Sequence, residues 1–212
     1  MAKSRKEDKA ARAAKKLCRK IIHKLPAKYR AIDLDALDSE IDELCLRYQD
    51  HPAFATHLSK RVVPLLALVR QAMQDYQEDS SLIIPIVQEA YYALEVLPPM
   101  RIMAYLLRLP GVKHIFVKKV QEVTTSTYGP KNGFKIEGTE WSKRRARFDV
   151  VACPYFEVCS LEGMPELTDV FCTSDEFFND LHPRVHFNRS ETLGRGDSRC
   201  DFEYIWDDDQ EK

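Results

Sequence analysis

Up to Leu109 the apolar residues of this chain recur three or four positions apart, and after Pro110 and Gly111 this spacing is lost. A period of three to four residues places apolar side chains on one face of an α-helix, so it predicts a series of amphipathic helices. Proline and glycine punctuate the series because they end or interrupt helices. The predicted helices cover residues 3–25, 33–48, 62–76, 83–97 and 101–109.

Beyond residue 112 the chain becomes richer in Val, Thr, Phe and Ile, which favour strands. Alternating apolar residues predict short strands from Phe148 to Ala152, at Val185 with Phe187, and at Phe202 with Tyr204. Helical spacing returns over residues 166–181. The sequence therefore predicts an α+β fold, in which a helical N-terminal half is followed by a small antiparallel sheet with packed helices.

The 212 residues carry a net charge of -1 that is unevenly distributed. Lys and Arg crowd residues 3–30, whereas residues 33–50 and 201–211 are acidic. We predict a basic helical extension over residues 1–30, a single α+β domain over 31–206, and an acidic tail over 207–212. The basic segment lacks interleaved aromatic residues and has acidic segments available in the same chain, so nucleic acid is disfavoured as a partner.

No run of about 18 apolar residues is present, and no apolar stretch follows the basic N-terminal residues as in a secretory signal. The sequence therefore predicts a cytoplasmic protein with no membrane partner. In that compartment the six cysteines are expected to be thiols. Composition leaves open whether the chain forms a homo-oligomer.

The cysteine and histidine spacing argues against a metal site. Zinc sites built from four thiolates usually contain a pair two to four residues apart, but Cys153 and Cys159 are six apart, and Cys172 and Cys200 stand alone. His182 and His186 lack the glutamate of a zinc-protease motif, although either has the ordinary pKa range of a general base. Phosphate-binding glycine loops and nucleophile-elbow serines are also absent from the sequence.

From residue 145 to 206 the chain contains an ordered series of residue types. The series is Cys153-Pro154-Tyr155, Gly163, Pro165-Glu166-Leu167, Cys172, Asp175, His182-Pro183, Phe187, Arg189, Thr192-Leu193, Gly196 and Cys200-Asp201-Phe202. In order and spacing this series resembles the L-2-amino-thiazoline-4-carboxylic acid hydrolase family. Ser190 departs from it, because a threonine often follows the arginine there. The N-terminal half matches only in its helical character.

The resemblance implies a hydrolase that opens a small cyclic amidine or thiazoline amino-acid derivative by adding water, without a cofactor. Cys172 would be a nucleophile if its thiol were partly ionised, and Asp175 would relay a proton from one helical turn away. His182 completes the expected catalytic set as a general base.

The expected substrate-binding set lies around this catalytic set. Arg189 would hold the substrate carboxylate, and Thr192 and the backbone at Gly196 would donate hydrogen bonds to developing charge. Cys153 and Cys200 would complete the lining of the pocket. Each of these residues also has a structural interpretation, such as packing for Cys172, an ion pair with Asp175 or Asp201 for Arg189, and a tight turn for Gly196.

Two other functions remain open on the sequence. A noncatalytic small-ligand-binding or sensory domain is suggested by the likeness of the C-terminal Gly-x-x-x-Cys-x-Phe pattern to vinyl-4-reductase-type domains. Nucleic-acid binding through the basic segment is the least favoured. It predicts an affinity that falls steeply with salt and that disappears when residues 1–30 are removed.

Overall fold

A computed structural model describes residues 2–107, 109, 121–142, 144–177 and 185–206. The chain forms two compact units. Unit 1 comprises Met1–Glu95 and Val158–Leu167, and unit 2 comprises Val96–Glu157 and Thr168–Lys212. The predicted domain boundaries at residues 30 and 206 stay predictions.

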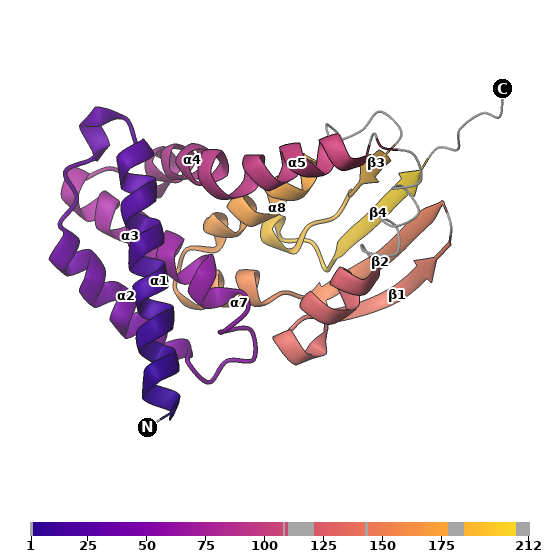
Figure 1. Ribbon diagram of the computed structural model, residues 1–212, viewed down its shortest axis with the longest axis horizontal. Coiled ribbons are helices and arrows are strands. Elements are labelled where there is room, and N and C mark those ends of the chain that lie inside the picture. Colours follow the sequence, from indigo (N-terminus) through magenta and orange to yellow (C-terminus); the bar gives the residue numbers. More distant parts are fainter. Residues whose placement is uncertain (1, 108, 110–120, 143, 178–184, 207–212) are drawn as a thin grey trace. The chain divides into compact units, whose positions relative to one another are not determined.

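Unit 1 is helical, as its apolar spacing predicts. Its main elements are α1 (Ala2–Lys24), α2 (Leu34–Tyr48), α3 (Val62–Tyr76) and α4 (Ser80–Tyr91), coloured indigo to magenta in Figure 1. Short 3-10 helices, η1 (Ala27–Tyr29) and η2 (Leu58–Lys60), lie between them. The helix α2 begins at a capped end, since the Asp33 carboxylate accepts hydrogen bonds from the backbone of Asp35 and Ala36. Fully buried side chains from three helices, including Ile21, Leu37 and Leu66, form the core.

The basic helix α1 pairs with the acidic helix α2. Arg19 forms a two-pronged ion pair with Asp38 at 2.9 Å, and the Lys15 ammonium lies 2.7 Å from Asp42. Ile21 and Leu25 of the same segment are buried. The part of the basic segment from Lys15 to Leu25 is thus paired and packed within unit 1.

Residues 158–167 join unit 1 through a buried carboxylate. Glu162 has a side chain only 4% exposed, and it accepts hydrogen bonds from Arg47 at 2.7 Å and Arg70 at 2.8 Å. The hydroxyl of Tyr48 donates a further bond to it at 2.5 Å. Three helical side chains are therefore held by one acidic group from a distant part of the chain.

The helices that follow α4 differ from the prediction. A π-helix spans Tyr92–Val96, and α5 spans Leu97–Leu107, whereas the sequence predicted a break at Pro98 and Pro99 and a new helix from Arg101. Both prolines lie in the first turn of α5, where a missing N–H removes no bond within that helix. None of the helices in the described part of the chain is both long enough and apolar enough to span a bilayer.

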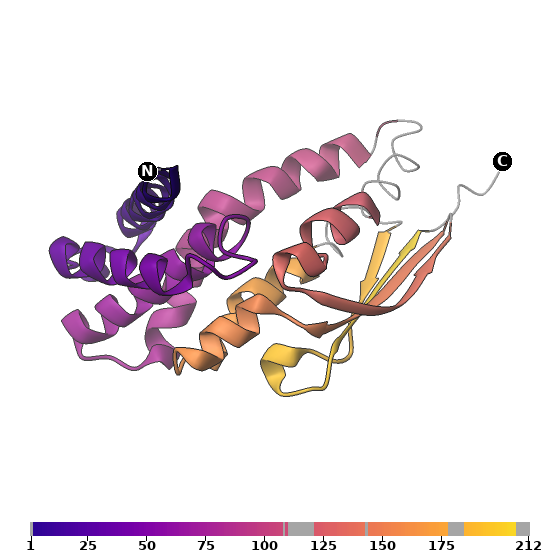
Figure 2. The ribbon, with the colours of Figure 1, turned by 90° about the horizontal axis from the view of Figure 1, so that it is seen from below.

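Unit 2 contains a four-stranded antiparallel sheet, as the α+β prediction requires. The strands β1 (Lys135–Trp141), β2 (Arg145–Ala152), β3 (Val185–Asn188) and β4 (Cys200–Trp206) lie in the order β1-β2-β4-β3. Figure 2 shows them as one twisted layer. The helix α7 (Pro154–Leu161) follows β2, and η5 (Pro165–Leu167) leads into α8 (Thr168–Glu176). The predicted helix over residues 166–181 is confirmed up to Glu176, and its residues from 178 lie outside the described part.

The two faces of the sheet differ in polarity because strand residues alternate between them. One face, the inner face, carries Phe148, Tyr204 and Phe187, which contact one another. The other face, the open face, carries polar residues of the same strands, such as Arg147 and Glu203, which are direct cross-strand partners. The site residues lie on both faces at the β4–β3 edge.

Candidate functional site

Arg189 follows β3 and lies on the inner face of the sheet. Its side chain is only 3% exposed. Its guanidinium donates to the Asp175 carboxylate at 3.1 Å and to the backbone carbonyl of Cys172 at 3.1 Å. It also lies over the rings of Phe187 and Phe202, 5.6 and 5.5 Å from their centroids. A buried cation at the C-terminal end of a helix is stabilised by the helix dipole, so this contact fixes α8 against the sheet.

The guanidinium of Arg189 has donors to spare. A guanidinium carries five N–H groups, and its recorded partners are Asp175, the Cys172 carbonyl and, at 3.4 Å, Glu176. Its Nε–H has no hydrogen-bond partner among the described residues. The ion pair between Arg189 and Asp175 agrees with the structural interpretation of Arg189 given above. It leaves some N–H donors of the guanidinium without a partner among the described residues.

The charge of this guanidinium acts on two thiols, Cys172 and Cys200, where it opposes the effect of burial on their pKa values. Burial raises the pKa of Cys172, and the nearby Asp175 carboxylate raises it further. Burial also raises the pKa of Cys153 to about 12. It raises the pKa of Cys200 as well, although a hydrogen bond from the Leu193 N–H acts to lower that pKa. The charges of Cys153, Cys200 and Arg189 all influence Cys172. The structure therefore brings five of the predicted residues into one neighbourhood, with thiols that stay protonated at neutral pH.

The raised pKa bears on the role foreseen for Cys172. A nucleophilic cysteine needs thiolate character, which a helix N-terminus or a nearby cation supplies. Cys172 is the middle residue of α8 and not at its N-terminus, and Asp175 opposes the effect of Arg189 on it. In this arrangement Cys172 is a proton-bearing group.

Thr192 and Gly196 belong to a closed turn. The Thr192 N–H donates to the Asp197 carboxylate at 2.7 Å, and the Gly196 N–H donates to the Leu193 carbonyl at 3.1 Å. Gly196 has φ +93°, a left-handed conformation that favours glycine, and a Cβ there would meet no atom within 4 Å. The backbone donors foreseen for a substrate are engaged within the turn.

Gly194 and Thr168 are neighbours of Cys172 that sequence reasoning missed. A Cβ on Gly194 would lie 3.1 Å from the Thr168 methyl and 3.5 Å from the Cys172 sulfur. The Thr168 methyl would have to move slightly to admit a Cβ, so this close approach of the turn to α8 favours glycine. Thr168 is buried, and its hydroxyl has no hydrogen-bond partner in the described structure. The glycine at position 194 does not by itself indicate this contact in the sequence, because the contact depends on how α8 packs.

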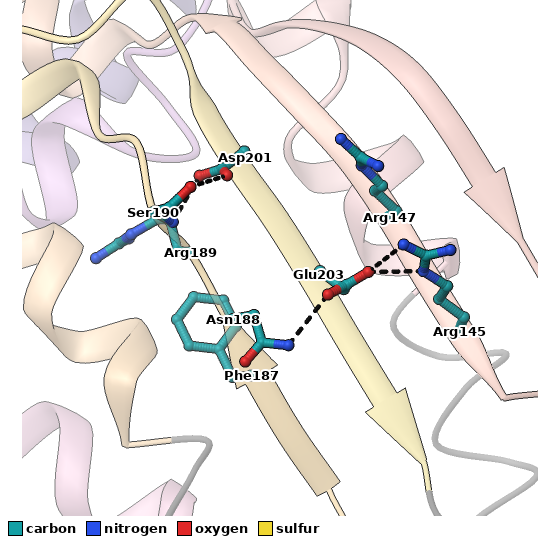
Figure 3. A pocket seen from close by; sticks show the side chains of 8 residues that line it. All are labelled: Arg145, Arg147, Phe187, Asn188, Arg189, Ser190, Asp201 and Glu203. Carbon is teal, nitrogen blue, oxygen red and sulfur yellow. Dashed lines mark hydrogen bonds and ion pairs between the residues drawn. The ribbon is translucent and has the colours of Figure 1, made fainter.

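The open face carries a hollow of about 520 Å³ at the same edge of the sheet. Figure 3 shows the residues around it, which are Arg145 and Arg147 from β2, Asp201 and Glu203 from β4, Phe187 and Asn188 from β3, and Arg189 and Ser190 after β3. Asp201 fixes the segment after β3, because it accepts hydrogen bonds from the Ser190 hydroxyl and from the backbone of Ser190 and Glu191. Burial pushes the pKa of Asp201 up, but these bonds together outweigh it and lower the pKa.

The two histidines considered as general bases are His182 and His186. His182 lies outside the described residues, and His186 is exposed on β3. Among the residues that are described, no group of three or more His, Cys, Asp or Glu side chains is arranged to hold a metal ion.

Comparisons with known proteins identify a family. A family model described as L-2-amino-thiazoline-4-carboxylic acid hydrolase matches residues 56–204. No curated protein matches the chain.

Solved structures with some likeness to the chain are H-NOX domains. One from Shewanella oneidensis in the Fe(II)CO ligation state is 12% identical, with 82% of this chain and 94% of that chain covered and a TM-score of 0.26. An unliganded Fe(II) H-NOX protein from K. algicida is 10% identical, with 84% and 96% covered and a TM-score of 0.28. Such low scores support no inference about this chain.

Proposed function

Because the chain belongs to the L-2-amino-thiazoline-4-carboxylic acid hydrolase family, we propose that it opens a small cyclic amidine or thiazoline amino-acid derivative by adding water. The observation that supports this most is the buried Arg189, which keeps unused N–H donors near the protonated thiols of Cys172 and Cys200. Such a group is suited to hold the carboxylate of a small ring in a sheltered place.

Substrate binding would change the environment of Asp175. A substrate carboxylate on Arg189 competes with Asp175 for the same guanidinium, which now donates to it at 3.1 Å. Once released from this cation, the Asp175 carboxylate holds a proton more readily. Asp175 is therefore the proposed base that takes a proton from the attacking water.

Cys172 would supply the complementary proton. The water oxygen bonds to the amidine carbon, its proton passes to Asp175, and the bond from that carbon to the departing ring atom breaks. The Cys172 thiol, whose pKa is raised by burial, protonates the departing atom. Asp175 then returns its proton to Cys172, so that the net change is addition of one water. His182 remains a proposed alternative base.

The test is turnover of L-2-amino-thiazoline-4-carboxylic acid by the purified full chain, followed by NMR of the ring carbon. We expect ring opening, and we expect Arg189→Lys to raise KM by about tenfold or more because a two-pronged contact is lost. Arg195→Lys is the matched control, since Arg195 is exposed and pairs with Asp169. Arg189→Lys with unchanged KM and kcat would remove Arg189 from substrate binding.

One observation favours a second function, a noncatalytic ligand-binding domain. Thiols with raised pKa values are poor nucleophiles, and a hydrolase can dispense with them only if Asp175 or His182 supplies the base. Tight binding of the same compound without consumption, lost in Arg189→Lys, would support this second function instead.

A further inference from the structure

We propose that the hollow on the open face of the sheet binds small carboxylates, with Arg147 as the recognition group. The thiols do not line this hollow, although Arg189 does at one end, and the proposal does not depend on the proposed hydrolysis. The walls of the hollow come from β2, β4 and the end of β3, elements whose register is fixed by the sheet (Figure 3).

Arg147 is exposed and has no hydrogen bond or ion pair with any described residue, although it lies between two carboxylates. Its cross-strand partners are Glu203 on β4 and Glu140 on β1. Both carboxylates turn instead to Arg145, at 2.5 Å for Glu203 and 3.6 Å for Glu140. Figure 3 shows the Arg147 guanidinium beside this pair without a contact to it. One strand thus carries a doubly paired arginine and, two residues on, an unpaired one.

The other charges of the hollow are already satisfied. Asp201 accepts from Ser190 and Glu191, and Glu203 accepts from Arg145 and from the Asn188 amide at 3.0 Å. Those contacts lower the pKa values of both acids, so each is ionised at neutral pH. Arg189, which also lines the hollow, is paired with Asp175 and Glu176. Among the described side chains around the hollow, Arg147 is therefore the cation without an ion-pair partner.

The arrangement selects a carboxylate over a phosphate. The parallel N–H groups of a guanidinium match the two oxygens of a carboxylate. A phosphate near neutral pH carries up to two negative charges, and the ionised Asp201 and Glu203 in the same hollow repel a dianion more than a monoanion.

Asn188 defines what the rest of the ligand offers. Its amide nitrogen donates to Glu203, so its carbonyl oxygen remains as an acceptor at the edge of the hollow. A carboxylate with an N–H a few bonds away can reach Arg147 and Asn188 together. N-acylated amino acids have this chemistry.

The experiment is a titration of the full chain with N-acetylglycine, followed by backbone amide NMR shifts. N-acetylglycinamide, which lacks the carboxylate, and inorganic phosphate are titrated in parallel. We expect saturable binding of N-acetylglycine, centred on β2 and β4, and binding at least about tenfold weaker for the other two probes.

Variants separate Arg147 from general charge effects. Arg147→Gln is expected to weaken binding by about tenfold or more, and Arg145→Gln is expected to weaken it too, because it frees Glu203 to pair with Arg147. Lys135→Gln is the matched control, since it removes a positive charge from β1 outside the hollow, where Lys135 pairs with Glu137. Cys172→Ala should bind N-acetylglycine as the wild type does.

Three outcomes would overturn the proposal. They are the lack of saturable binding, equal affinity in Arg147→Gln and the wild type, and phosphate binding as tight as that of N-acetylglycine. Loss of ring-opening activity with N-acetylglycine binding intact would count against the proposed hydrolysis alone.

Discussion

At the scale of single residues, the hydroxyl of Thr168 is a buried polar group without a partner among the described residues. Valine has nearly the same shape and no hydroxyl to desolvate. We expect Thr168→Val to raise the free energy of unfolding by about 1 kcal/mol, measured by urea denaturation. Thr168→Ala, which also removes the methyl group, should lower it because a cavity remains. A loss of stability in Thr168→Val would mean that the hydroxyl has a partner after all.

Gly196 tests the backbone of the turn. Its φ of +93° lies in the region that residues with a Cβ avoid, although space around it is open. Gly196→Ala should therefore cost about 1 kcal/mol of unfolding free energy, and Gly196→Asn less, because asparagine tolerates left-handed conformations. Thermal unfolding of the two variants gives the comparison. Equal stability of both variants and the wild type would contradict the strained-turn explanation.

Gly194 tests a contact with a side chain. Its φ is not left-handed, but a Cβ would press on the Thr168 methyl at 3.1 Å. We expect Gly194→Ala to destabilise the chain, and Thr168→Ser, which removes that methyl, to relieve part of the loss. A double-mutant cycle by urea denaturation measures this coupling. Purely additive effects would show that the crowding arises elsewhere.

At the scale of elements, Glu162 ties residues 158–167 to α2 and α3. Replacing it with glutamine leaves Arg47 and Arg70 without their shared carboxylate, so we expect a loss of about 3 kcal/mol at pH 7. Glu162→Asp, which keeps the charge on a shorter stem, should lose less. Urea denaturation of the full chain measures both variants.

The contribution of Glu162 should also depend on pH. Burial acts to raise the pKa of Glu162, but hydrogen bonds from Tyr48, Arg47 and Arg70 together lower it. A carboxyl with a lowered folded-state pKa stabilises the fold above its unfolded pKa and loses this effect as the pH falls through the folded value. The stability gap between the wild type and Glu162→Gln should therefore shrink below about pH 4. A constant gap from pH 7 to pH 3 would contradict this linkage.

Some elements could be predicted from the sequence and others could not. The spacing of apolar residues identifies α2 and α4, because each buries one face within unit 1, and it identifies α3, whose residues from Val62 to Val69 are all buried. The strand β1 has no such signal. It is an edge strand with mostly exposed residues, and Gly138 and a register shift interrupt its pairing with β2. A strand that buries little surface leaves no alternation to detect.

The residues of the predicted site could be named from the sequence for a different reason. The order of Cys153, Cys172, Asp175, Arg189 and Cys200 comes from a family pattern, and the structure groups these residues. Their protonation could not be foreseen, because burial and the partner of Arg189 depend on how α8 packs on the sheet. The hollow around Arg147 was missed because it arises from cross-strand register, which a single sequence does not give.

At the scale of the whole molecule, the N-terminal basic segment cannot be treated as a detachable arm. Removing residues 1–30 would expose the side chains that pack against Ile21 and Leu25, and it would leave Asp38 unpaired. Substitutions that remove positive charge at exposed positions, such as Lys16→Gln with Lys20→Gln, are the cleaner test of nucleic-acid binding. We expect no salt-sensitive binding in a gel-shift assay of the wild type, and a shift abolished by these substitutions would contradict that expectation.

The order of segments along the chain has a consequence for synthesis on the ribosome. Unit 1 takes its first 95 residues from one end of the chain and its last segment, Val158–Leu167, from far downstream. Its helices can pack early in synthesis. Arg47 and Arg70 lack their contact with Glu162 until more than 60 residues beyond Glu95 have been translated. Until then, among the described residues, Arg47 has only Glu43 and Arg70 has only Glu40 as an acidic partner, so the contact that holds Val158–Leu167 in unit 1 forms late in elongation, a period in which chaperones can act on the nascent chain.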